Sequence, residues 1–99
     1  MTITRTRRLQ KVVERFARSG REQVLHALHE VIALLVAFDP PAQNLLRERY
    51  RDHALRGDKK GIRELHLAQD DLLLYWVQID KHHIVLLDIV THEELRRGG

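Results

Sequence analysis

"GIRELHLAQDDLLLYWVQIDKHHIVLLDIV", residues 61–90, decides the fold. Residues 61–67 alternate between two faces, with Ile62, Glu64 and His66 on one of them. Residues 72–79 are apolar almost throughout, and residues 83–90 form another apolar-rich run. Short runs of this kind, bounded by turn residues, are typical of strands. Asp70-Asp71 and Asp80-Lys81 supply the two turns, so the stretch predicts three consecutive antiparallel strands with a buried middle strand.

Upstream of these strands, the apolar residues recur with the period of a helix. Within residues 6–18 they fall at i, i+3, i+4 and i+7, counted from Leu9. A second stripe over residues 24–36 predicts another helix, which Ser19 and Glu22 would open as a capping box. The Asp39-Pro40-Pro41 segment would end it, because proline lacks an amide proton and disfavours helix in the preceding residue.

The remaining segments complete a single domain over residues 1–99. Residues 2–5 are compatible with a short edge strand, and residues 42–52 with either a short helix or a loop. Thr91, with Glu94 three residues later, would cap a last helical turn. Helices followed by strands predict an α+β fold, in which an N-terminal antiparallel helical hairpin packs on a small twisted antiparallel β-sheet.

Composition excludes several classes of protein. The chain has no cysteine, which excludes a disulfide framework and thiolate metal sites and is consistent with a reducing cytosol. The longest apolar run, residues 31–38, is far shorter than the roughly 20 residues that span a bilayer, and we expect no secretory signal at the start of the chain. The formal charge is +3, and the cations are clustered, as in surfaces that bind polyanions and in ordinary solvated surfaces.

Four of the seven histidines have a structural explanation. His26 and His29 are spaced i, i+3 on the second predicted helix, a spacing compatible with a metal site. No third ligand is evident, so we expect a solvated helix edge with nothing bound. His82 and His83 are neighbours on a strand, so their side chains point to opposite faces and cannot chelate one ion together.

The other three histidines lie where regular elements begin or end, which is where functional groups tend to collect. His53 precedes the loop before the first predicted strand, His66 ends that strand, and His92 follows the third strand. Each alone is compatible with a structural role. In an antiparallel meander the end of the first strand, the start of the second and the end of the third share one rim. His66, Asp70 and His92 are therefore predicted to converge there.

This set fits the cleavage of RNA through its own 2′-hydroxyl. That reaction needs a base for the hydroxyl, an acid for the leaving 5′-oxygen and cations for the phosphate. Histidine titrates near pH ~6.5, so both of its forms are available at neutral pH. The cations predicted to hold phosphate are Arg56, Lys59, Lys60 and Arg63. No metal or other cofactor is required for this reaction.

The same residues resemble a known family. "DHALRGDKKGIRELHLAQDDLLLYW", residues 52–76, followed by "VTHEEL", residues 90–95, is similar to the YafQ-type mRNA interferase toxins of bacterial type II toxin–antitoxin systems, in the RelE/ParE superfamily. The recurring pattern of that family is roughly DHxLxGxxxGxRxxHxxxDxxLxY, followed by an ending like GTHxxLF. The match covers less than half of the chain, but it is dense and in register.

The resemblance implies a RelE-like fold and a ribosome-dependent endoribonuclease that cuts mRNA in the ribosomal A site. It also implies a cognate antitoxin that neutralises the toxin in a hetero-oligomer. The family's catalytic or RNA-positioning residues correspond to His53, His66, Asp70 and His92. We expect His66 and His92 to transfer protons, with His92 as the acid, while His53 and Asp70 position or polarise.

The chain also departs from the family pattern. Asp71 stands where some members have tryptophan, which would place an anion beside the phosphate. Asp88 replaces an arginine near the end of the last strand, and Val90 replaces the glycine of GTH. Arg96 replaces the terminal aromatic residue, although with Arg97 it could restore positive charge for binding RNA. These departures define an alternative function: a catalytically weakened relic that only binds an antitoxin or RNA.

Overall fold

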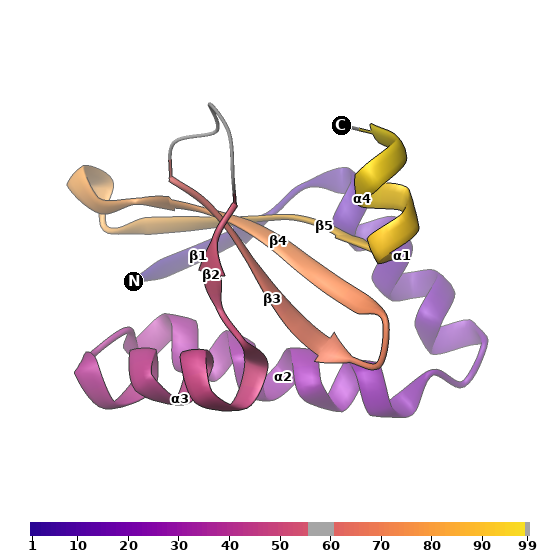
Figure 1. The fold of residues 1–99 in the computed structure, drawn as a ribbon, viewed down its shortest axis with the longest axis horizontal. Coiled ribbons are helices and arrows are strands. Elements are labelled where there is room, and N and C mark those ends of the chain that lie inside the picture. The colour runs from indigo at the N-terminus through magenta and orange to yellow at the C-terminus, as the bar shows by residue number, and fades with distance from the viewer. Residues whose placement is uncertain (56–60, 99) are drawn as a thin grey trace.

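A five-stranded sheet forms the centre of the molecule in the computed structural model, which describes residues 1–55 and 61–98 (Figure 1). The strands lie in the order β1-β5-β4-β3-β2. Their bounds are β1 (Thr2–Arg5), β2 (His53–Ala54), β3 (Ile62–Ala68), β4 (Asp71–Gln78) and β5 (His83–Val90). The helices are α1 (Arg7–Arg18), α2 (Glu22–Ala37), α3 (Pro40–Tyr50) and α4 (His92–Gly98). A 3₁₀ turn over Ile79–Lys81 joins β4 to β5.

The predicted α+β fold class and its three-stranded meander are confirmed. β3 pairs antiparallel with β4, and β4 pairs antiparallel with β5. The sheet is mixed, however, because the edge strand β1 runs parallel to β5. Two threonines of β1 fix this pairing: the hydroxyl groups of Thr2 and Thr4 lie 2.7 and 2.8 Å from the two ring nitrogens of His83. His82, by contrast, is exposed.

The predicted capping box at Ser19 is wrong, although both helices form. Ser19 ends α1: its hydroxyl donates to the carbonyl of Arg15 at 3.0 Å and therefore faces backwards. Gly20 follows with φ +73°, and the amide of Arg21 donates to the carbonyl of Phe16 at 3.0 Å. This is a Schellman motif, which satisfies the last carbonyls of α1. Arg21 is then the N-cap residue of α2, without a capping hydrogen bond from its side chain.

The segment after the second helix, for which a helix and a loop were both compatible, forms the helix α3. It begins at Pro40, within the Asp39-Pro40-Pro41 segment that was predicted to end the preceding helix. The Asp39 carboxylate accepts a hydrogen bond from the amide of Ala42 at 2.9 Å, and Pro40 occupies the first helical position. Proline is favoured there because its missing amide has no partner in the first turn of a helix. The predicted cap at Thr91 is confirmed: its hydroxyl accepts from the Glu94 amide, and its own amide donates to the Glu94 carboxylate.

The main core lies between one face of the sheet and the first three helices. Leu65, Leu73, Tyr75 and Ile84 from the strands pack against residues such as Leu35 from the helices. Leu72 is also fully buried, but its neighbours along β4 show that it lies on the opposite face, paired with His66 and Val90. That opposite face carries the candidate site. None of the helices formed by the described residues has the length and apolar character needed to cross a membrane.

Gly61 is expected to be sensitive to substitution because its backbone and its surroundings both exclude a side chain. It has φ +80°, and a Cβ atom would lie 3.0 Å from Nε1 of Trp76 and 3.2 Å from the carbonyl oxygen of Val77. Gly61→Ala should lower the free energy of unfolding by about 1–3 kcal/mol. Urea denaturation measures this. Gly20→Ala is the matched control, since Gly20 has φ +73° with nothing within 4 Å. An equal loss in both variants would contradict a role for the Trp76 contact.

Candidate active site

The structure brings the four predicted site residues together at one end of the sheet. His66 lies near the end of β3, His92 begins α4, and His53 lies on β2 at the sheet edge. The ring centroids of His66 and His92 are 5.2 Å apart, and those of His53 and His66 are 6.3 Å apart. Asp70 reaches the same cluster from the β3–β4 turn. The predicted convergence at the rim of the sheet is therefore confirmed as a placement.

Asp70 orients His92. Its carboxylate accepts hydrogen bonds from Nδ1 of the His92 ring and, at 3.3 Å, from the His92 backbone amide. The hydrogen bond from the ring lowers the pKa of Asp70, so the carboxylate stays charged. Because Asp70 can only accept while it is charged, it holds the proton on Nδ1 of the neutral ring. Nε2 of His92 is then the nitrogen left for chemistry.

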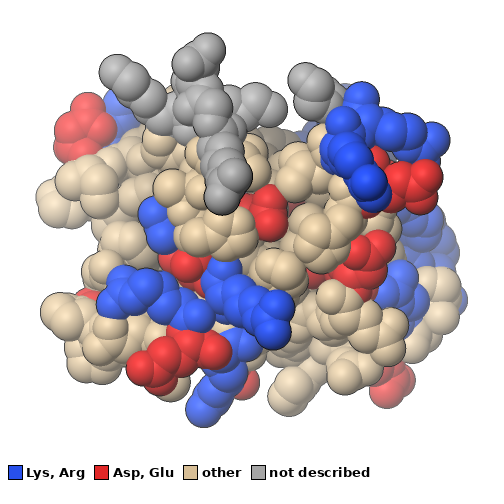
Figure 2. Space-filling model, viewed as in Figure 1, with Lys and Arg blue, Asp and Glu red and all other residues tan. Residues whose placement is uncertain are grey.

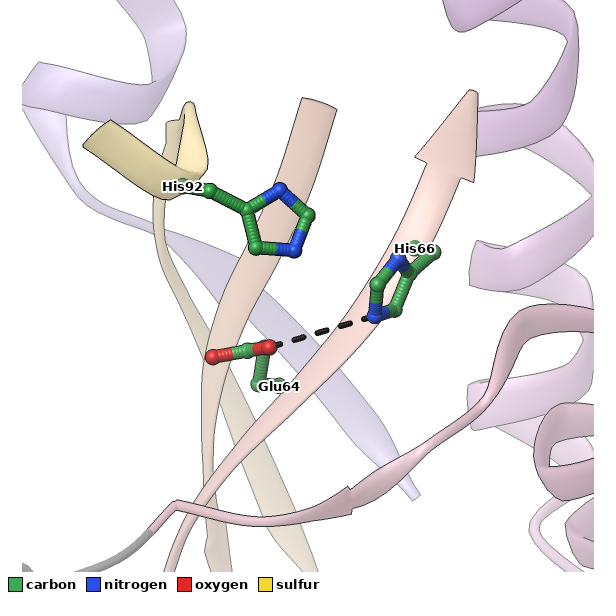
Figure 3. A group of neighbouring side chains, drawn as sticks. All are labelled: Glu64, His66 and His92. Atoms are coloured by element: carbon green, nitrogen blue, oxygen red, sulfur yellow. Dashed lines mark ion pairs between the residues drawn. The ribbon is translucent and has the colours of Figure 1, made fainter. Parts of the chain in front are cut away.

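Glu64 also belongs to the cluster. The strand pattern predicted that it shares a face with His66, but no role was predicted for it. It is only 6% exposed, and one carboxylate oxygen lies 3.4 Å from Nε2 of His53 and 4.0 Å from Nε2 of His66. Figure 3 shows His66 and His92 facing each other beside this carboxylate. The charge of Glu64 could have revealed its place in the site from the sequence. A carboxylate on a buried strand, two residues before His66, is costly unless it is paired.

The electrostatic environment favours the neutral form of His66. Burial lowers the pKa of His66, and the nearby His92 acts in the same direction, while Glu64 opposes both. The charge of Arg51 also lowers the pKa of His66, which identifies a cation near the site that the sequence did not single out. The carbonyl of Arg51 accepts a hydrogen bond from Nδ1 of His53 at 2.7 Å. His66 is thus suited to accept a proton at neutral pH.

This pKa shift predicts a pH dependence of stability. A histidine with a lowered pKa in the folded state contributes stability fully above its unfolded value, about 6.5, and loses it as the pH falls through the folded value. The free energy of unfolding should therefore fall below about pH 6.5, and His66→Gln should reduce this dependence. Urea denaturation from pH 7.5 to 5 measures both profiles, with His29→Gln on the exposed side of α2 as control. Parallel profiles for wild type and His66→Gln would contradict the assignment.

The predicted phosphate-binding cations are not all in place. Arg56, Lys59 and Lys60 lie outside the described residues. Arg63 points to the opposite face of β3 from His66, where its guanidinium group bonds to the Asp52 carboxylate at 2.8 Å. This ion pair raises the pKa of Arg63. The grouping of Arg63 with the loop cations is therefore wrong, because strand alternation turns it away from the histidines. Arg96 is exposed on α4.

The departures at positions 71 and 88 also have structural explanations. Asp71 is the first residue of β4 and shares the helix-facing side with Leu73, where it is 6% exposed and bonds to Arg21 at 2.5 Å. It therefore does not lie beside the histidines, contrary to the expectation of an anion beside the phosphate. Asp88 lies 3.7 Å from Arg8 and accepts a hydrogen bond from the Ile89 amide. Burial raises the pKa of Asp88.

The cluster also contains a set of possible metal ligands. Glu64, His66 and His92 each offer one ligand atom, and these atoms all lie within 4.8 Å of one another. Among the described residues, no other set of three or more His, Asp or Glu side chains is close enough to share an ion. His26 and His29 therefore do not belong to a possible metal site of this kind.

The chain matches the model of one protein family, described as the bacterial toxin of type II toxin–antitoxin systems, YafQ, over residues 1–97. The chain belongs to this family. Membership confirms the resemblance that residues 52–95 carry and extends it to the N-terminal helices. A search of curated proteins gave no significant match.

Several solved toxin structures share the fold. A metal-bound toxin from Helicobacter pylori has 29% identity and a TM-score of 0.79, covering 96% of this chain and 98% of that one. The toxin of the E. coli DinJ–YafQ toxin–antitoxin complex has 25% identity and a TM-score of 0.70, covering 94% of this chain and 93% of that one. A YoeB/ParE toxin from Agrobacterium tumefaciens, at 14% identity, has a TM-score of 0.66 over 93% of this chain and 99% of that one. The last likeness concerns the fold alone.

Proposed function

We propose that this YafQ-family toxin is a ribosome-dependent endoribonuclease that cuts mRNA in the A site by attack of the 2′-hydroxyl on the adjacent phosphate. The observation that carries the proposal is the pair of imidazoles 5.2 Å apart, one with a lowered pKa and the other held through Nδ1 by a carboxylate. A base and an acid on two sides of one phosphodiester are what the reaction requires.

In this mechanism the two histidines have different roles. His66, neutral at the working pH, takes the proton of the 2′-hydroxyl as the 2′-oxygen attacks phosphorus. His92 acts in its doubly protonated form: Nδ1 keeps its hydrogen bond to Asp70, and Nε2 donates its proton to the 5′-oxygen as the bond from phosphorus to that oxygen breaks. The products are a 2′,3′-cyclic phosphate and a free 5′-hydroxyl group. Each correctly placed proton transfer is worth roughly 100- to 10,000-fold in rate.

His53 and Glu64 support this pair. Glu64 lies within 4.0 Å of a ring nitrogen of both His53 and His66, so it limits how far either ring can turn. Arg51, whose charge acts on His66, supplies positive charge near the place where negative charge develops on the phosphate in the transition state. The other proposed contacts to RNA are Arg56, Lys59, Lys60 and Arg96.

The direct test replaces the nucleophile. Translating ribosomes are incubated with the toxin and with mRNA that carries a single 2′-deoxy sugar at the mapped cut site. Cleavage should disappear at that site and remain at unmodified sites on the same message. Cutting that persists next to the deoxy sugar would disprove attack by the 2′-hydroxyl.

We also propose that a cognate antitoxin binds this chain in a hetero-oligomer. The support is the E. coli relative, which is solved in complex with the antitoxin DinJ. One argument for the alternative, a catalytically weakened relic, no longer holds, because Asp71 is paired with Arg21 away from the histidines.

A second candidate function is the binding of a divalent metal by Glu64, His66 and His92. Two imidazoles and one carboxylate are ligands typical of zinc and copper sites, and the donor atoms are within 4.8 Å of one another. The H. pylori relative is solved as a metal-bound toxin. A bound ion would take up the nitrogens needed for proton transfer, so its effect would be inhibition.

Calorimetric titration with ZnCl₂ tests this second candidate. His66→Ala and His92→Ala should each weaken zinc binding by at least about tenfold, because each removes one of three ligands. The double variant His26→Ala/His29→Ala is the matched control and should bind zinc like the wild type. If the control alone loses binding, the ion sits on α2 and the site proposed here is wrong.

A further inference from the structure

A basic groove borders the candidate active site on the side of α1. It has a volume of about 650 Å³ and lies between α1 and the junction of β5 with α4. Its lining includes four exposed cations of α1: Arg7, Arg8, Lys11 and Arg15. Figure 2 shows Lys and Arg side chains gathered on the side of the molecule where Figure 1 places α1 and α4.

These cations form one continuous stripe. Arg7, Lys11 and Arg15 are spaced four residues apart, so they lie one above another on the same side of the helix. Like charges at this spacing repel one another and cost a few tenths of a kcal/mol per pair. Among the residues that the structure describes, none of these three forms an ion pair. None of the three cations is therefore neutralised by a direct ion pair within the described residues.

The groove also contains two carboxylates, and both are engaged by the chain itself. Asp88 accepts a hydrogen bond from the Ile89 amide at 2.9 Å and lies 3.7 Å from Arg8. Glu94 accepts from the Thr91 amide at 2.9 Å in the capping box of α4. Arg8 thus offsets Asp88, and Glu94 faces the positive end of its own helix. The three cations of the stripe remain available to an anionic ligand.

The groove and the histidine cluster are adjacent. Val90 and Glu94 line the groove, and His92 lies between them in the sequence. An extended polyanion in the groove would therefore pass the first turn of α4 and reach the imidazoles without leaving the surface. A single RNA strand has this shape and this repeating charge.

We propose that this groove binds the sugar–phosphate backbone of the RNA strand next to the cut, with Arg7, Lys11 and Arg15 contacting successive phosphates. The proposal rests on the ribonuclease function proposed above and adds a binding site to it. Contacts to phosphates fix the position of a strand but do not read its sequence. The groove would thus supply affinity, whereas any sequence preference would come from elsewhere in the complex.

The test is the binding of a fluorescein-labelled, 12-nucleotide single-stranded RNA, measured by anisotropy at several salt concentrations. All proteins carry His92→Ala so that the RNA stays intact. Lys11→Gln/Arg15→Gln is compared with Arg18→Gln/Arg47→Gln, which removes the same charge from α1 outside the groove and from α3. The first double variant should bind roughly tenfold more weakly, and its salt dependence should be shallower by about 1.4. Circular dichroism confirms that every variant is folded.

Two outcomes would overturn the proposal. Equal losses in the two double variants would show a general attraction to charge rather than a site. Unchanged RNA binding in Lys11→Gln/Arg15→Gln, combined with weaker binding of a labelled poly-glutamate peptide, would assign the groove to an acidic protein segment. Cleavage on ribosomes is measured separately with His92 intact. If the wild type cuts nothing while the groove variant still loses RNA affinity, the ribonuclease proposal fails and the RNA site stands.

Discussion

His92→Ala is expected to lower the rate of ribosome-dependent mRNA cleavage by roughly 100- to 10,000-fold, because it removes the proposed acid for the leaving 5′-oxygen. His92 is exposed and at the start of α4, and its side chain lies outside the main core, so the fold should survive. Quantitative primer extension on a message engaged by ribosomes measures the rate. Relief of growth inhibition on expression provides a second readout.

His82→Ala is the matched control for this prediction, since His82 is exposed in the turn before β5 and far along that strand from His92. It should cut mRNA at the wild-type rate. Antitoxin binding should be unchanged in both variants. If His92→Ala is as toxic as the wild type, His92 is not the acid; if neither the wild type nor the variant is toxic, the relic alternative gains support.

Asp52→Ala is expected to cost about 3–5 kcal/mol of folding stability. The Asp52 carboxylate holds the guanidinium group of Arg63 at 2.8 Å and accepts a hydrogen bond from the hydroxyl of Tyr75. Tyr75 is fully buried, and burial raises its pKa, so the phenol stays protonated and needs an acceptor. Removing the carboxylate would leave a buried hydroxyl and a partly buried cation without their partner.

Urea denaturation at pH 7 measures the loss. Asp80→Ala, at an exposed carboxylate in the turn between β4 and β5, is the control and should change stability by less than about 0.5 kcal/mol. Asp52→Ala/Arg63→Met should recover part of the loss, because it removes the stranded cation as well. A cost below about 1 kcal/mol for Asp52→Ala would contradict a structural role for this network.

The parts of the fold that depend on local pattern were predictable from the sequence. The two helical stripes and the period-two run at residues 61–67 are visible without any tertiary contact. The same is true of the Thr91 cap, because both of its partners lie within four residues. The convergence of His66, Asp70 and His92 was also predictable, since the ends of a meander must share a rim.

Other features depend on contacts between distant residues. The parallel pairing of β1 is supported by hydrogen bonds between the hydroxyl groups of Thr2 and Thr4 and the ring of His83, about 80 positions away. The capping pattern at Ser19 fits two structures, and the choice is made by Gly20 and the carbonyls of α1. Whether Asp71 belongs to the turn or to β4 could not be read from the sequence. It belongs to β4, and its ion pair with Arg21 holds its side chain on the helix-facing side of the sheet.

The short strand β1 also affects how the toxin behaves in a crowded solution. It pairs with the outer edge of β5 over residues 2–5. Unpaired strand edges recruit strands from other molecules, and short edges limit this. Residues 2–5 therefore cover the outer edge of β5 and leave only a short edge of their own, which limits strand pairing between molecules.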